Sequence, residues 1–176
     1  MAFSERLNPT LFDKLVADLD MPGLRENSAL SELSRSTMQQ YSVPKLDRFN
    51  ESALRDTVKR DLAWLLNTSN LAAGVDLDPY PHVKSSVLNY GVNALTGKAV
   101  SQRVLQQRAR DIQTAIRNFE PRIAQKTLSV QPIEGTQRDN SVTYAIHGDI
   151  TTAAQPIPVT FKTDVEADTS IVTVRD

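Results

Sequence analysis

Apolar residues recur with two different periods along this chain. Between residues 50 and 120 they return every three or four positions, which is the spacing of one face of an α-helix. After residue 127 they alternate with polar residues, which is typical of a strand with one buried face. The change of period predicts an α+β protein, in which N-terminal helices pack on a small antiparallel β-meander of about four strands.

Two core helices are expected before the strands. The first covers residues 51–67 behind a cap at Asn50, and the second runs from a cap at Ser101 to Glu120. Between them, a short helical turn over residues 82–90 is expected to stop at Gly91. The apolar positions of the two core helices are Leu54, Val58, Leu62, Leu65 and Leu66, then Leu105, Ala109, Ile112, Ile116 and Phe119.

The chain before these helices has a different pattern. Leu11, Leu15 and Leu19 recur every four residues, which indicates one short amphipathic helix. The polar, Ser-rich stretch that follows predicts a surface arm with little core of its own. We therefore expect an N-terminal arm over residues 1–49 and one main domain over residues 50–176.

The strands are expected from four alternating stretches. Their apolar positions are Leu128 and Val130; Val142, Tyr144, Ile146 and Ile150; Ile157, Val159, Phe161 and Val165; and Val172 and Val174. A meander that does not close has free edges, and an edge strand can pair with the backbone of another chain. The last strand is short and ends the chain, so Ile171, Val172, Thr173 and Val174 are the candidate edge.

Composition removes several classes of function. The 20 basic and 21 acidic residues nearly cancel, so no global field favours nucleic acid or an anionic membrane. No apolar run approaches the roughly 20 residues of a membrane span, and the N-terminus lacks the apolar core of a secretory signal, so a cytoplasmic location is expected. Without cysteine, and with only His82 and His147, the sequence predicts no disulfide, metal site or cofactor.

The stretch AIRNFEPRIAQKTLSV, residues 115–130, carries Glu120, Pro121 and Arg122 where the second helix gives way to a strand. The proline pushes Glu120 out of the helical region and redirects the chain. In one interpretation the two charges form an ion pair that stiffens this joint. In the other they reach a neighbouring chain through charge-assisted hydrogen bonds. If the pair is partly exposed, losing either charge would cost at most about 1 to 2 kcal/mol.

The same stretch argues against catalysis. A glycosidase needs two carboxyl groups, one of which donates a proton near neutral pH. Arg122 favours the charged form of Glu120, which is the opposite requirement. The other acids in or near the strands have no visible pairing, and neither histidine lies in a catalytic motif. His82 is expected at the start of a short helix, and His147 on the solvated side of a strand.

Arginines recur on the second core helix. Arg103, Arg110 and Arg117 return every seven residues on the side opposite the apolar positions. This stripe is either an ordinary solvated face or a binding face for a partner.

Four segments resemble, in order and spacing, the TssE family of type VI secretion baseplate subunits, which is related to phage tail baseplate wedge proteins described as lysozyme-like. They are RDLAWLLNT (60–68), YPHVKSSVLNYGVNALTG (80–97), IRNFEPRI (116–123) and PVTFKTDVEADTSIVTV (158–174). The resemblance covers roughly residues 50–175.

The resemblance implies a non-enzymatic building block of a contractile injection machine. Such a subunit joins the wedge proteins TssF and TssG to the contractile sheath of TssB and TssC, and offers a strand edge that starts sheath assembly. The resemblance ties Glu120, Pro121 and Arg122 to baseplate assembly, so it favours the interpretation in which they act on a partner. The alternatives are a peptidoglycan-cleaving lysozyme-like enzyme and a generic cytoplasmic adaptor.

Overall fold

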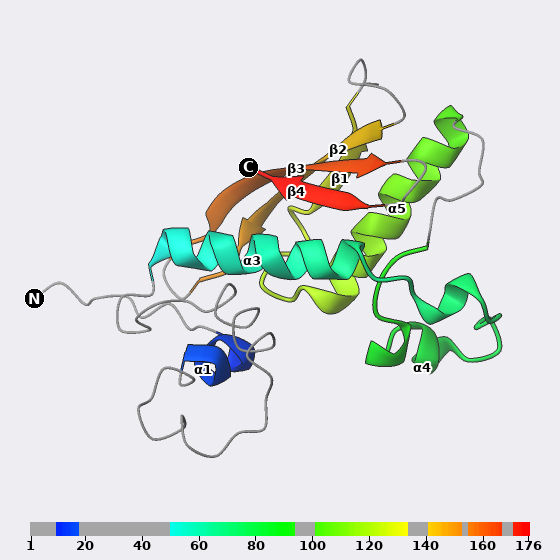
Figure 1. Cartoon of the computed structure of the whole chain (residues 1–176), viewed down its shortest axis with the longest axis horizontal. Helices are drawn as coiled ribbons and strands as arrows, with labels where there is room; N and C mark the ends of the chain where they lie inside the picture. Colours follow the sequence, from blue (N-terminus) through cyan, green and yellow to red (C-terminus); the bar gives the residue numbers. More distant parts are fainter. Residues whose placement is uncertain (1–9, 18–49, 94–100, 134–140, 153–154, 167–170) are drawn as a thin grey trace, which may run out of the picture. The chain divides into compact units, whose positions relative to one another are not determined.

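The protein is described here by a computed structural model that covers residues 10–17, 50–93, 101–133, 141–152, 155–166 and 171–176 (Figure 1). The chain divides into two compact units, Met1–Thr57 and Val58–Asp176. The division falls inside helix α3 (Glu51–Leu66). The expected domain boundary between residues 49 and 50 stays a prediction.

In the first unit, helix α1 (Leu11–Ala17) begins with a reciprocal cap. The Thr10 hydroxyl donates to Asp13 Oδ2 at 2.6 Å, and the Asp13 N–H donates to Thr10 Oγ1 at 3.2 Å. Asp13 is fully buried, whereas Leu11 is 73% exposed. The expected short helix is therefore present, and it buries its polar cap rather than Leu11. Leu19 and the arm after it lie outside the described residues.

The two predicted core helices are confirmed as α3 (Glu51–Leu66) and α5 (Gln102–Phe119). Asn50 Oδ1 accepts the N–H of Ala53 at 2.9 Å, and the Ser101 hydroxyl accepts the N–H of Val104 at 3.3 Å. Every predicted apolar position on these helices is buried except Phe119, which is half-buried.

The short helical turn expected over residues 82–90 is present but divided in two, and Gly91 follows it with a φ of +113°. Two short helices take its place, α4 (Pro81–Lys84) and the 3₁₀ helix η5 (Val87–Asn89), preceded by another 3₁₀ helix, η4 (Leu71–Ala73). The Ser86 hydroxyl accepts the N–H of Leu88 at 3.3 Å and donates to the carbonyl of Val83 at 2.9 Å. These bonds compete with helix continuation and start a new turn.

The predicted meander is confirmed. Strands β1 (Ser129–Pro132), β2 (Ser141–Ile150), β3 (Ile157–Glu166) and β4 (Val172–Arg175) lie in the order β1-β2-β3-β4, each antiparallel to the next. All the predicted apolar strand positions are buried. Because side chains alternate between the faces of a sheet, they form one core face.

Helices lie beside both edge strands of this sheet. Figure 1 shows α3 beside β4, and α5 packs against β1. In the part of the chain that the structure describes, no helix is long and apolar enough to cross a membrane.

Candidate interaction sites

The Glu120-Pro121-Arg122 segment is held by backbone hydrogen bonds from both sides. The N–H of Glu120 donates to the carbonyl of Ile116 at 2.9 Å and completes the last turn of α5. Beyond the proline, the carbonyl of Arg122 accepts the N–H of Thr151 at 2.8 Å, just after β2. The joint is therefore fixed between the end of α5 and the end of β2.

The side chains of Glu120 and Arg122 form a bidentate ion pair. Arg122 Nε donates to Glu120 Oε1 at 2.7 Å, and Arg122 Nη2 donates to Glu120 Oε2 at 2.6 Å. Arg122 Nη2 also donates to Asp61 Oδ2, on α3. We call Asp61, Glu120 and Arg122 the Arg122 cluster.

The Arg122 cluster is largely withdrawn from water. The side chain of Glu120 is 5% exposed and that of Arg122 is 18% exposed. Burial alone would lower the pKa of Arg122, but the hydrogen bonds and negative charges of Glu120 and Asp61 outweigh it and raise this pKa. Pro121, between them, is exposed. The ion pair is therefore internal, and the exposed part of the segment is its proline.

A second arginine and three aromatic rings lie near the cluster. Arg60 Nε donates to Asp61 Oδ1 at 2.8 Å, and the Arg60 guanidinium lies 4.8 Å from the centre of the Trp64 ring. Tyr90 packs edge-to-face on Phe119 with ring centres 5.3 Å apart. Burial, then the nearby charges of Asp61 and Glu120, raise the pKa of the Tyr90 hydroxyl.

Gly91 brings the segment after η5 against the end of α3. Its φ is +113°, and a Cβ on it would lie 2.2 Å from the carbonyl oxygen of Thr68. The N–H of Val92 donates to that same oxygen at 2.9 Å, and the N–H of Asn70 donates to the carbonyl of Val92 at 3.3 Å. Only a residue without a side chain permits this approach.

Three of the segments singled out in the sequence thus meet at the cluster: 60–68 supplies Asp61, 80–97 supplies Tyr90, and 116–123 supplies Glu120 and Arg122. Asp61 was not identified as a site residue from the sequence. The one sequence feature that could have pointed to Asp61 is its position in the segment RDLAWLLNT, but nothing in that segment indicates that it pairs with Arg122.

The arginine stripe is exposed on α5, at Arg103, Arg110 and Arg117. Arg110 Nη2 donates to Gln107 Oε1 at 2.7 Å, so part of its hydrogen-bonding capacity is used within the helix. Arg108, which the sequence analysis did not single out, is instead 3% exposed and donates to the carbonyl of Asn93. The stripe is available to a partner, and no partner is identified by its geometry.

Strand β4 is an outer strand, as expected for the candidate edge. The N–H of Glu166 donates to the carbonyl of Ile171 at 3.0 Å, so Ile171 and Thr173 turn their main-chain groups toward β3. Val172 and Val174 turn theirs outward. The Asn67 side chain accepts the N–H of Val172 at 2.9 Å and donates to its carbonyl at 2.8 Å.

Asn67 directly follows helix α3, which also borders the far end of β4. There Lys59 Nζ pairs with Asp176 Oδ2 at 2.8 Å. Eight residues of helix and four residues of strand both span about 12 to 13 Å, so the helix follows the strand between these two contacts. Among the described residues, no hydrogen bond reaches the outward main-chain groups of Val174. Of the candidate edge, Val174 is therefore the residue whose outward main-chain groups are available for pairing.

Strand β1 is the opposite edge of the sheet, and few of its outward main-chain groups are available for pairing. The N–H of Ile133 donates to the carbonyl of Thr143 at 2.8 Å, which turns Val130 and Pro132 outward. Pro132 has no N–H, and the outward carbonyl of Leu128 accepts Gln113 Nε2 at 2.8 Å. Only Val130 keeps an outward donor within β1.

The histidines lie where they were expected. His82 is an exposed residue of the first turn of α4, and His147 is exposed on β2, where its Nδ1 lies 3.0 Å from the Thr160 hydroxyl. Within the described ranges, no group of three or more His, Cys, Asp or Glu residues could hold a metal ion.

Residues 52–155 match the family model described as baseplate wedge protein gp25. This range contains the whole Arg122 cluster and strands β1 and β2, and it covers more than half of the chain. No curated protein matches the chain.

Proposed function

The chain belongs to the baseplate wedge protein gp25 family, and from this premise we propose that it is the TssE-type subunit of a type VI secretion baseplate, acting in the cytoplasm. In this role it joins the wedge proteins TssF and TssG to the sheath proteins TssB and TssC and starts sheath assembly. The observation that carries the proposal is the match over residues 52–155, within which segments 60–68, 80–97 and 116–123 supply the side chains around Arg122.

Different surfaces suit the two partners. We assign wedge contacts to the exposed Pro121, and to Arg110 and Arg117, which suit an acidic partner. We assign sheath contacts to the outward main chain of Val174, because backbone hydrogen bonds allow an edge strand to add another strand. The two assignments can be separated experimentally, since Val174 lies on β4, whereas Arg110 and Arg117 lie on α5 and Pro121 just after it.

The edge assignment is tested by proline substitution. Val174→Pro removes an outward N–H and is expected to abolish sheath growth from assembled baseplates while leaving binding to TssF and TssG intact. Thr173→Pro is a stability control, because its N–H faces β3. Assembly would be followed by electron microscopy, and wedge binding by co-purification.

Val130→Pro is the matched variant on β1, and it is expected to permit sheath growth. If Val130→Pro blocks growth and Val174→Pro does not, the sheath edge is β1. If folded Val174→Pro loses wedge binding, the terminal strand is an adaptor surface and the chain acts as a generic adaptor there.

We propose further that the protein is not an enzyme. The Glu120 side chain is 5% exposed and both of its carboxylate oxygens accept hydrogen bonds from Arg122, so this carboxyl group is poorly placed to reach a glycosidic bond. Purified protein is expected to release no more soluble product from peptidoglycan than a heat-denatured sample. Release that disappears in Glu120→Gln would restore the lysozyme-like alternative.

A further inference from the structure

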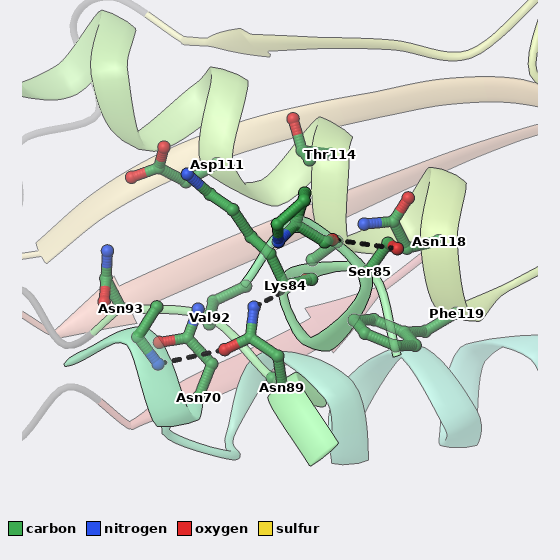
Figure 2. A pocket seen from close by; sticks show the side chains of 14 residues that line it. Asn70, Lys84, Ser85, Asn89, Val92, Asn93, Asp111, Thr114, Asn118 and Phe119 are labelled. Carbon is green, nitrogen blue, oxygen red and sulfur yellow. Dashed lines mark hydrogen bonds between the residues drawn. The ribbon is translucent and has the colours of Figure 1, made fainter. Parts of the chain in front are cut away.

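A pocket separate from the Arg122 cluster and from both sheet edges lies between α5 and the short helices over residues 70–93 (Figure 2). Its volume of about 370 Å³ is within the range of ligand-binding pockets. Nothing in the proposed joining of wedge and sheath requires it.

The wall of this pocket is built before any ligand binds. Asn89 is 7% exposed, and its side chain accepts the N–H of Ala72 at 2.9 Å and donates to the carbonyl of Lys84 at 2.8 Å. This amide ties η4 to α4. Gly91 and its close approach to Thr68 hold the next part of the wall. A pocket whose wall is already ordered loses little conformational entropy on binding.

The groups that line the pocket are polar but nearly neutral in sum. Asn70, Asn93 and Asn118 contribute three side-chain amides, and Lys84 and Asp111 contribute opposite charges (Figure 2). The buried Oδ1 of Asn70 has no hydrogen-bond partner in the described part of the chain. This arrangement offers both donors and acceptors and does not select a cation or an anion.

The same chain contains an example of how such an amide is used. The Asn67 side chain pairs with both the N–H and the carbonyl of Val172, so a single asparagine satisfies both main-chain groups of a strand residue. Aromatic rings that stack on sugars need an open face, whereas Phe119, the aromatic side chain among the described residues that line the pocket, packs against Tyr90. A main chain therefore suits this pocket better than a saccharide.

Apolar side chains are exposed on the helices that form the pocket wall. Leu71 on η4 is 40% exposed, and Val87 and Leu88 on η5 are 79% and 69% exposed. Exposed apolar groups beside a polar pocket are typical of a protein-binding surface. They would contact the side chains of a segment whose backbone enters the pocket.

We propose that this pocket binds an extended segment of the TssF–TssG complex, with its main-chain N–H and C=O groups paired to Asn70, Asn93 and Asn118. This inference rests on the proposed function, because it takes the wedge proteins as partners. It adds a contact that is independent of Pro121 and of the arginine stripe.

The first test compares the full-length protein with two variants in binding to purified TssF–TssG complex. Asn118→Leu combined with Thr114→Val removes polar groups from the pocket and is expected to weaken binding about tenfold or more. Gln102→Leu, an exposed change on the same helix outside the pocket, is expected to bind as the unchanged protein does. Unchanged affinity in the folded double variant would overturn the pocket assignment, whereas no binding by the unchanged protein would instead refute the proposed function.

The second test needs no destabilising variant. A photo-reactive residue in place of Thr114 is expected to cross-link to one segment of the complex, and that segment as a synthetic peptide is expected to shift the side-chain amide NMR signals of Asn70, Asn93 and Asn118. Cross-links scattered over the complex, or a peptide that leaves these signals unmoved, would overturn the proposal. Muramyl dipeptide is the competing probe, and shifts with it alone would assign the pocket to a peptidoglycan fragment.

Discussion

Replacing Arg122 with alanine is expected to lower the free energy of unfolding by about 3 to 5 kcal/mol, because a buried charge left without its partner is strongly destabilising. Glu120, with a side chain 5% exposed, would lose both hydrogen bonds to the guanidinium and face Asp61 without a cation between them. Urea unfolding followed by circular dichroism measures the loss. The sequence analysis expected a stability loss of at most about 1 to 2 kcal/mol if the ion pair was partly exposed. Because Glu120 is buried, the larger loss is expected instead.

The other variants of the cluster separate its parts. Glu120→Ala leaves Arg122 paired with Asp61, so a smaller loss of about 1 to 3 kcal/mol is expected. Arg117→Ala, on the exposed face of α5, is the matched control and is expected to stay within about 0.5 kcal/mol. An Arg122→Ala protein as stable as the Arg117→Ala protein would contradict a structural role for the cluster.

Whether the segment also binds a partner is decided by Pro121, since it is exposed and takes no part in the ion pair. Loss of TssF–TssG binding in a stable Pro121→Ala protein supports a contact there. Normal binding in that protein would leave the segment as a structural joint.

Gly91→Ala is expected to cost about 3 kcal/mol or more, because two penalties combine. The φ of +113° strains any residue with a side chain, and the new Cβ would lie 2.2 Å from Thr68 O. The backbone bonds between residues 68–70 and Val92 should weaken first, so faster hydrogen exchange at the Val92 amide is the specific readout.

Gly74→Ala is the matched control for this change. Its φ is −120°, and a Cβ there meets nothing within 4 Å, so a change within about 0.5 kcal/mol is expected. If both variants unfold at the same urea concentration as the unchanged protein, the close approach of Gly91 to Thr68 does not hold the segment.

Local chemistry made much of this fold predictable from the sequence. The caps at Asn50 and Ser101, the stop imposed by Pro121 and the alternating strands all depend on residues near one another in the chain, and all appear where they were expected. The break at Ser86 was not predicted. It arises because the hydroxyl of this serine competes for backbone hydrogen bonds on both sides of it.

The candidate site needed the tertiary structure. Asp61 meets Arg122 from 61 residues away, and Asn67 meets Val172 from 105 residues away, and no local pattern encodes either pairing. The sequence placed Ile171 to Val174 in a final strand, since alternation depends only on neighbouring residues. Which main-chain groups of that strand face outward depends on its register with β3 and on the helix beside it, so only the folded chain decided that Val172 is covered and Val174 is open.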